Sequence, residues 1–381
     1  MIYLDNHATT PCDPRVVEVM LPFFSERFAN PSSEIHQMGR DARKAVEQAR
    51  LQVAKLINAE PDEILFTGSA TESNNLSILG LAQVQKCPSR NRIITSAIEH
   101  KSVLAPCRVL EGRGYQLSVL PVNNLGQVNE DIAREQINDK VLFVSIQAAN
   151  NEIGTIQRVR LLCDLAHKQG GVFHCDAAQA VGKIPVDINE WRVDLLSFSA
   201  HKMYGPKGIA ALYVRGGLSH IPLKPILYGG DQESSLRPGT LNVPLIVGFG
   251  EACRIALEVM EEESKRLARM RNNLETALME IIPDLKRNGD IVNRLPNNSS
   301  LTFLGVDAEA LIMSMPELML STGSACNSGA QEPSYVLKAI GLNHDEANNT
   351  LRVGLGRFNT DSEIMTSTDL FLKGISTLRQ Q

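Results

Sequence analysis

The sequence predicts an α/β protein with a large domain, built on a mostly parallel seven-stranded sheet flanked by helices, and a smaller α+β domain. Seven short apolar runs alternate with helical patterns between about residues 62 and 215. After Pro244 the pattern changes to one long helical segment followed by shorter strands and helices. Alternating strands and helices favour parallel strands with helices packed on the faces of the sheet.

The strands of the large domain are expected at apolar runs of the kind that form buried strands. Helical patterns separate several of these runs, for example at 72–85 and 159–170. The seven runs are 63–68, 92–97, 115–122, 140–146, 171–177, 194–200 and 209–215.

A long helix that links two domains is expected at 245–282, where apolar residues recur at helical spacing as far as Pro283. The final helix is expected to begin with Asp361 as its N-cap. We place the large domain at 15–257 and the small domain at 1–14 and 258–381. Within the small domain we expect strands at 299–305 and 350–358 and helices at 307–315 and 334–341.

Length and composition exclude several classes of protein. The 381 residues suffice for one large and one smaller domain, and 43% hydrophobic with 21% charged residues is typical of a globular protein. A net charge of -5 argues against a nucleic-acid-binding surface. No apolar run approaches a membrane span, and the first residues lack the basic and apolar regions of a signal peptide. We expect a cytoplasmic protein with no membrane or direct nucleic-acid partner.

The cysteines form neither a disulfide framework nor a metal site. They are odd in number, scattered, and contain no C-x-x-C pair. Most are therefore expected to be reduced core residues, and no metal is expected. The seven are Cys12, Cys87, Cys107, Cys163, Cys175, Cys253 and Cys326.

Ligands bind beyond the carboxyl ends of parallel strands, so the residues after each apolar run are the candidates for a site. Residues 69–72 follow the first run and open a helix, where they form either a phosphate site or a simple N-cap. His100 follows the second run and is either a structural histidine or a cleft residue. Asn151 follows the fourth run, in a segment that also suits a turn.

Two further strand ends carry Asp176 and Lys202. His174, Cys175 and Asp176 cannot converge on one metal ion, because adjacent strand residues point to opposite faces. A single carboxylate facing the cleft is the better interpretation. Lys202 is either a surface residue or a nucleophilic amine at the mouth of the sheet.

Taken together, these residues are the set that pyridoxal 5'-phosphate (PLP) requires. The coenzyme needs a lysine for its Schiff base, an anion site for its phosphate, and an acid beside the pyridine nitrogen. Desolvation lowers the pKa of a lysine and exposes a nucleophilic amine, whereas arginine remains protonated.

Many stretches of the chain resemble the cysteine desulfurases of the NifS/IscS type, within the class V aminotransferases, whose fold is that of aspartate aminotransferase. The resemblance covers almost the whole chain, and the motifs occur in the same order. They are "YLDNHATTP", "ATESNN", "AIEHKSV", "NNEIGTIQ", "DAAQAVGKIP", "SAHKMYGPKG", "LRPGT", "GSACNS", "EPSYVLKAIGL" and "LRVGLGRF".

The resemblance implies a role for each matching residue. Lys202 would bear PLP, and His100 would stack on its ring and act as acid and base. Asp176 would pair with the ring nitrogen and Gln179 with the ring hydroxyl. Asn151 and Arg352 would hold the substrate carboxylate, which an arginine fork fits bidentately. The phosphate would be held by Ala70, Thr71, Ser199 and His201, with Thr240 supplied by the neighbouring subunit of a homodimer.

The sulfur-accepting nucleophile is expected to be Cys326. It resembles the catalytic cysteine of the family, and it lies in a small, polar, Gly-containing stretch before Pro333, which predicts a mobile exposed loop of the small domain. The implied reaction removes sulfur from L-cysteine and gives L-alanine and a persulfide on Cys326. An acceptor protein would then take the sulfur for iron–sulfur cluster assembly, tRNA thiolation or DNA phosphorothioation.

Other functions share parts of this set. A selenocysteine lyase or another PLP-dependent lyase or aminotransferase would share Lys202 and Asp176, and Cys326 argues against an aminotransferase. A Cys–His hydrolase that uses Cys326 would not explain the presence of Lys202. A catalytically silent scaffold protein of a sulfur pathway would not explain why all the key side chains are present. The chain departs from the family where Gly68 and Ser69 stand in reversed order and where Ser234 replaces an arginine.

Overall fold

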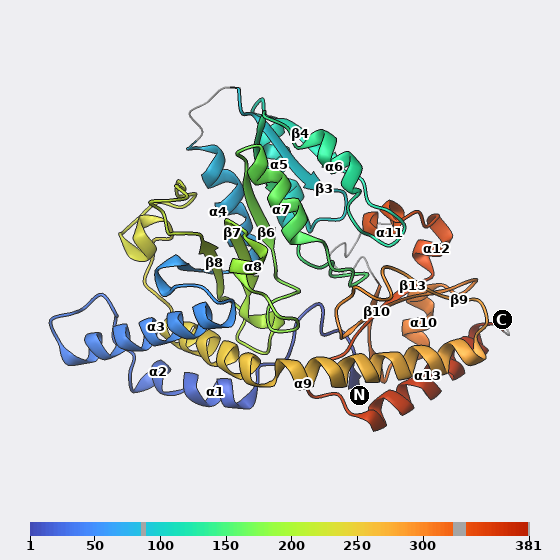
Figure 1. Cartoon of the computed structure of the whole chain (residues 1–381). Helices are drawn as coiled ribbons and strands as arrows, with labels where there is room; N and C mark the ends of the chain where they lie inside the picture. Colours follow the sequence, from blue (N-terminus) through green and yellow to red (C-terminus); the bar gives the residue numbers. More distant parts are fainter. Residues whose placement is uncertain (85–88, 323–332, 380–381) are drawn as a thin grey trace.

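The computed structural model describes residues 1–84, 89–322 and 333–379. Its largest sheet has seven strands in the order β2-β8-β7-β6-β5-β3-β4 (Figure 1). β8 runs antiparallel to both of its neighbours, whereas the other adjacent strands are parallel, so the prediction of a mostly parallel sheet is confirmed. The strands are β2 (Ile64–Thr67), β3 (Arg92–Ser96), β4 (Gln116–Leu120), β5 (Val141–Ser145), β6 (Val172–Asp176), β7 (Leu195–Ser199) and β8 (Ala210–Val214).

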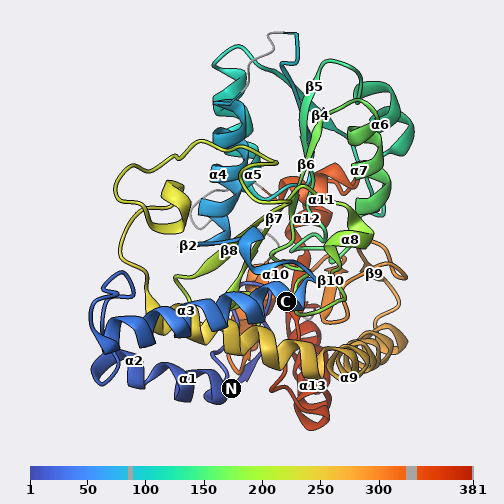
Figure 2. The ribbon, with the colours of Figure 1, turned by 60° about the vertical axis from the view of Figure 1, so that its left-hand side comes forward.

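Helices cover both faces of this sheet, because successive strand side chains point to opposite sides and both sides are apolar. On β7, Leu195 packs in the same core as α4 and α5, whereas Leu196 and Phe198 pack with α3, α7 and α9. Figure 2 shows the helices on either side of the strands. These helices are α3 (Gln37–Leu56), α4 (Ala70–Ala82), α5 (Lys101–Glu111), α6 (Glu130–Gln136), α7 (Val159–Lys168) and α8 (Ile188–Trp191).

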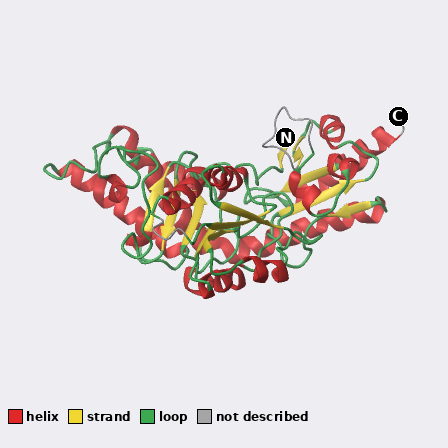
Figure 3. Ribbon diagram, turned by 90° about the horizontal axis from the view of Figure 1, so that it is seen from above, coloured by secondary structure: helices red, strands yellow, loops and turns green. Residues whose placement is uncertain are grey.

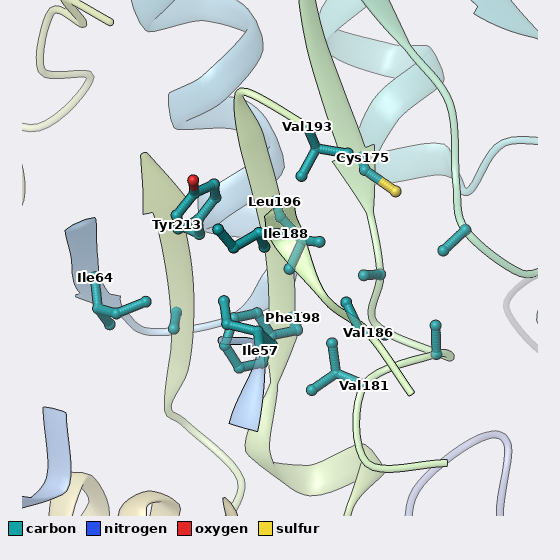
Figure 4. Close-up of a cluster of buried hydrophobic side chains, with 14 of the residues drawn as sticks. Ile57, Ile64, Cys175, Val181, Val186, Ile188, Val193, Leu196, Phe198 and Tyr213 are labelled. Atoms are coloured by element: carbon teal, nitrogen blue, oxygen red, sulfur yellow. The ribbon is translucent and has the colours of Figure 1, made fainter. Parts of the chain in front are cut away.

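The larger of these cores fixes the central strands. Cys175, Leu196 and Phe198 point into one cluster with side chains from the neighbouring segments (Figure 4). Phe198 also packs edge-on against Phe249 of α9, with ring centroids 5.6 Å apart. Cys175 therefore faces hydrocarbon, and the next residue, Asp176, points to the other side of the sheet.

A single helix, α9 (Val243–Ile281), connects two hydrophobic cores, as the sequence predicted (Figure 1). Its 39 residues span about 58 Å at 1.5 Å per residue. Ile246 and Ala256 belong to the core of the large sheet, whereas Leu267 and Leu278 belong to the second core. The division proposed after residue 257 falls between these two sets.

The second core underlies a smaller domain with an antiparallel sheet in the order β12-β13-β10-β9. In Figure 3 this domain extends to one side of the large sheet. Its strands are β9 (Leu285–Arg287), β10 (Asn298–Phe303), β12 (Ser321–Thr322) and β13 (Thr350–Gly354). Its helices are α10 (Ala308–Ser314), α11 (Tyr335–Ala339), α12 (His344–Asn348) and α13 (Asp361–Arg379).

The first residues of the chain join the smaller domain. β1 (Ile2–Tyr3) pairs with β11 (Leu318–Met319), and Leu4 lies in the second core. The chain then returns to the large domain through the remaining elements α1 (Pro14–Met20), α2 (Pro22–Ser25) and the short turns η1 (Pro61–Glu63), η2 (Ala200–Lys202) and η3 (Gln232–Ser235). The segment between β1 and α1 thus crosses from one domain to the other.

One helix boundary differs from the prediction. Thr360, rather than Asp361, caps α13, because its hydroxyl accepts a hydrogen bond from the Glu363 N–H at 3.2 Å. The Glu363 carboxylate in turn accepts the Thr360 N–H at 3.0 Å, which completes a capping box. In the parts of the chain that the structure describes, no helix has the length and apolar character needed to cross a bilayer.

Candidate active site

The predicted residues converge on a cavity of about 310 Å³ at the carboxyl ends of the parallel strands, within the size range of small-molecule sites. Ser199 and Thr240 lie outside its lining; Ser199 is buried at the end of β7, and Thr240 is exposed. Cys326 lies outside the described residues. The predicted residues that line the cavity are Ala70, Thr71, His100, Asn151, Asp176, Gln179, His201, Lys202 and Arg352.

Lys202 lies in the short turn η2, directly after β7. Its Nζ donates hydrogen bonds to the carbonyl oxygens of His7 and Ala8, the latter at 2.8 Å. The amine is thus half-buried in the cavity, against the segment that crosses between the domains. Of the two interpretations of this lysine, the structure supports the amine at the mouth of the sheet.

Asp176 ends β6 with its carboxylate held on both oxygens. Oδ2 accepts a hydrogen bond from the Asn74 side-chain amide at 2.8 Å, and Oδ1 accepts the Ala178 N–H at 3.0 Å. The residue is only 7% exposed. Two donors hold this buried carboxylate in a fixed orientation. Such a group can pair with a protonated ring nitrogen of a ligand in the cavity.

The turn after β2 presents the N-terminus of α4 to the cavity. Ser69 caps the helix by accepting the Glu72 N–H at 3.1 Å, and Ser69, Ala70 and Thr71 line the cavity. The cap and the anion site are therefore compatible, since the first-turn N–H groups carry the positive end of the helix dipole. The reversed order of Gly68 and Ser69 requires no special backbone, because Gly68 does not adopt a positive φ.

The histidines of the cavity have distinct proton assignments. His100 caps α5, and its Nδ1 accepts the Ser102 N–H at 3.1 Å. Nδ1 therefore carries no proton, so proton exchange by this ring takes place at Nε2. Burial and the nearby Lys202 lower the pKa of His201 to about 4, so this ring is neutral at pH 7.

Arg352 forms the cationic wall of the cavity from β13. It is 3% exposed, and its Nη2 donates to Asp5 Oδ1 and to Ser321 Oγ, both at 2.8 Å. Nη1 donates to the Asn151 carbonyl at 3.2 Å. Its Nε is buried and has no hydrogen-bond partner in the described residues. The guanidinium of Arg352 lines the cavity, and such a group suits a carboxylate ligand.

Two more carboxyl groups are buried next to the cavity. Burial raises the pKa of Glu99 to about 8 and that of Glu152 to about 7. Glu99 accepts hydrogen bonds from Ser96 Oγ at 2.6 Å and from the Gln147 N–H at 2.9 Å. Glu152 accepts a hydrogen bond from Ser334, the N-cap of α11. Both carboxyls have structural partners and neither lines the cavity.

The described cysteines are not activated thiols. Burial raises the pKa of Cys107 to about 12 and that of Cys175 and Cys253 well above the usual value. Cys163 contacts both ring nitrogens of His167, but its Sγ donates a hydrogen bond to the Arg192 carbonyl oxygen at 3.1 Å. Burial also raises the pKa of this thiol. Cys12 is half-buried with a raised pKa.

The sequence matches the family of class-V aminotransferases over residues 2–366. The chain belongs to this family. A relative named cysteine desulfurase IscS, from Rickettsia felis (strain ATCC VR-1525 / URRWXCal2), is 44% identical over 383 residues and is aligned over 100% of this chain and 92% of the relative.

Solved structures of the same family share the fold. One described as a NifS-like protein superimposes with a TM-score of 0.92 at 35% identity, covering 99% of this chain and 100% of that chain. Another, described as SspA in complex with cysteine, has a TM-score of 0.81 at 37% identity and covers 94% of this chain and 100% of that chain.

Sequence reasoning did not assign roles to His7, Asn74 and Ser102, all of which belong to the site. His7 lies in the "YLDNHATTP" motif, and Asn74 in "ATESNN", so the motifs contained the signal. His7 comes to the site because the segment between β1 and α1 crosses between the domains. Asn74 and Ser102 are joined by a 2.8 Å hydrogen bond between α4 and α5. In this class-V aminotransferase chain, such contacts between distant segments complete the environment of Lys202 and Asp176.

Proposed function

We propose that the chain is a PLP-dependent cysteine desulfurase that converts L-cysteine into L-alanine and leaves a persulfide on Cys326. The observation that carries this proposal is one cavity that joins Lys202, the buried Asp176 and Arg352. The 44% identity to a cysteine desulfurase over the full chain specifies the reaction. A structure with cysteine bound, in a relative of the same fold, supports the substrate.

The cavity suits PLP in each of its chemical features. Lys202 would hold the aldehyde carbon covalently, Asp176 the pyridine nitrogen and Gln179 the ring hydroxyl. Ala70, Thr71, Ser199 and His201 would hold the phosphate. When bound, the coenzyme supplies an electron sink for the carbanion formed at the substrate Cα.

Residues of the chain then divide the remaining tasks. Arg352 and Asn151 bind the substrate carboxylate, and Lys202 Nζ takes the proton from Cα. His100 exchanges a proton with the substrate thiol through Nε2. The Cys326 thiolate attacks the substrate sulfur, so that a new S–S bond forms as the Cβ–S bond breaks. The electron pair of the broken bond stays with Cβ, which takes up a proton before alanine is released. The high pKa values of the described cysteines support this assignment.

The quaternary structure and sulfur delivery belong to the same proposal. Thr240 is exposed and lies outside the cavity of its own chain, which suits a residue that reaches the phosphate of a neighbouring subunit in a homodimer. The Glu72–Arg237 ion pair, at 3.0 Å, holds the "LRPGT" segment against the start of α4. We place the enzyme in the cytoplasm, where an acceptor protein takes the sulfur for iron–sulfur cluster assembly, tRNA thiolation or DNA phosphorothioation.

Mass spectrometry and product analysis test this function. After borohydride reduction, the PLP-loaded enzyme should carry the coenzyme on Lys202 and not on Lys183, the other lysine buried beside the site. L-Cysteine should yield alanine and a persulfide. Cys326→Ser should keep the coenzyme and abolish the persulfide, whereas Cys12→Ser should retain both. A protein that stays colourless with added PLP contradicts the proposal, and alanine release from selenocysteine but not cysteine supports the lyase alternative.

A further inference from the structure

A chain of hydrogen bonds starts at an acceptor whose role is unambiguous. The backbone carbonyl of Glu152 can only accept, so the Asn298 side-chain atom 3.1 Å away must be the amide nitrogen. The same Nδ2 lies 3.2 Å from His7 Nε2. Asn298 therefore donates to His7 Nε2, which places the ring proton of His7 on Nδ1.

This proton assignment requires a neutral imidazole, and the surroundings of His7 favour one. The residue is 1% exposed, and burial together with the nearby cations Lys183 and Arg352 lowers its pKa well below the usual value. His7 Nδ1 thus donates to Gln179 Oε1, 3.1 Å away. The orientation of the Asn298 amide in the small domain thus fixes the proton position of His7, which in turn fixes the hydrogen bond to the Gln179 amide of the large domain.

Gln179 Oε1 accepts a second hydrogen bond from Lys183 Nζ at 2.8 Å. Lys183 is 8% exposed, and burial lowers the pKa of its amine, but the amine keeps N–H donors in both protonation states. Gln179 Nε2 donates one of its two N–H groups to the His7 carbonyl at 3.0 Å. The oxygen of Gln179 is therefore fully engaged, and one N–H remains for the cavity that Gln179 lines.

We propose that His7 and Lys183 are positioning residues that hold the Gln179 carboxamide with its N–H, rather than its oxygen, toward an anionic ligand oxygen. The inference rests on the proposed function, in which this ligand oxygen is the ring oxygen of PLP. Two donors aimed at Oε1 prevent the amide from flipping, and a flipped amide would present one oxygen to another.

The colour of bound PLP reports on this hydrogen bond. A donor to the ring oxygen stabilises the anionic form of that oxygen. It therefore lowers the midpoint pH at which the bound coenzyme loses its proton, which is observed as a change in the visible absorption band. Removing the donor should raise this midpoint by about one pH unit, a tenfold change in proton affinity, and should weaken PLP binding about tenfold. A residue that only stabilises the fold would change neither the midpoint nor its dependence on Gln179.

The experiment compares Lys183→Met and His7→Phe with Gln179→Ala, each titrated from pH 6 to 10 with PLP bound. All three should raise the midpoint, and adding Gln179→Ala to either of the other variants should have no further effect. His7→Asn, which offers an amide N–H near the position of Nδ1, should restore most of the wild-type value. Ser264→Ala is the matched control, because its hydroxyl donates to the Lys183 backbone carbonyl without contacting Gln179.

The result that overturns the inference is a wild-type midpoint in Lys183→Met and His7→Phe, or a Gln179→Ala enzyme that itself titrates like wild type. Circular dichroism of each variant separates loss of the fold from loss of the hydrogen bond. Failure of the proposed function would be distinct, since the wild-type protein would then show no visible band with PLP and release no alanine.

Discussion

The side-chain amide of Asn74 donates one hydrogen bond to the Asp176 carboxylate and another to Ser102 Oγ, both at 2.8 Å. It thus ties the acid at the end of β6 to the N-terminal halves of α4 and α5. Asn74 is fully buried, so water cannot replace the lost donor when the residue is changed. The orientation of the acid therefore depends on a residue one helical turn away from the phosphate site.

Asn74→Leu should weaken PLP binding about tenfold or more, because a hydrogen bond to a charged group contributes about 1.5–3 kcal/mol. The dissociation constant, measured by absorbance at equilibrium, checks this. Asn75→Leu, one residue along the same helix and partly exposed, should bind PLP like wild type. Equal affinities for the two variants would show that Asn74 does not support the acid.

Arg352→Lys should raise the KM for L-cysteine by about 10–100-fold while leaving bound PLP unchanged. Lysine keeps the charge but loses the planar fork that makes a bidentate contact with a carboxylate. Steady-state alanine release measures the effect. Arg379→Lys, on the exposed last turn of α13, is the control. An unchanged KM would remove Arg352 from the carboxylate site.

Stability should fall as the pH drops from about 6.5 toward 4, in part because of His174. This ring lies between Ser145 Oγ and Ser197 Oγ, and burial lowers its pKa to about 4. Between these pH values the unfolded chain binds a proton that the folded protein excludes, so the free energy of unfolding rises with pH, by up to about 3 kcal/mol for this group.

Urea unfolding at pH 7, 6 and 5 should show a shallower pH slope for His174→Gln than for wild type, even though the variant is less stable at pH 7. His220→Gln, at an exposed position, should keep the wild-type slope. Parallel slopes for His174→Gln and wild type would mean that this ring is protonated in the folded protein.

Glu233→Gln should destabilise the protein by about 3–5 kcal/mol, the usual effect of breaking a buried ion pair. The Glu233 carboxylate accepts hydrogen bonds from Arg50 at 2.7 and 2.9 Å and from the Phe66 N–H at 2.7 Å. Thermal and urea unfolding check this, with Glu47→Gln as the control, because Glu47 contacts the same arginine from an exposed position. A loss equal to that of the control would contradict the role of the buried pair.

Ser235→Gly should stabilise the protein by up to about 1 kcal/mol. Ser235 has φ of 61° and follows two other non-glycine residues with positive φ, Glu233 and Ser234. Left-handed backbone costs an L-residue roughly 1–2 kcal/mol, and glycine avoids this cost at the expense of some chain entropy. A lower melting temperature for Ser235→Gly than for wild type would show that the serine side chain contributes more than the backbone relief.

The sequence by itself determined the seven strands and the linking helix, and it predicted Lys202 as the reactive amine. Short apolar runs form buried strands because of their local composition, and ligands bind at the carboxyl ends of parallel strands. Asp176 and Lys202 could therefore be predicted as site residues, because each lies at or just after the end of an apolar run. His100 could be located in the same way, whereas Arg352 was expected only from the resemblance of the "LRVGLGRF" motif to the family.

Only the tertiary structure decided the antiparallel direction of β8, the pairing of β1 with β11, and the proton and amide orientations around Gln179. These features depend on contacts between segments far apart in sequence; His7 and Gln179, for example, are 172 residues apart. The donor or acceptor role of an amide or imidazole is set by its neighbours in space, and local composition carries no information about those neighbours.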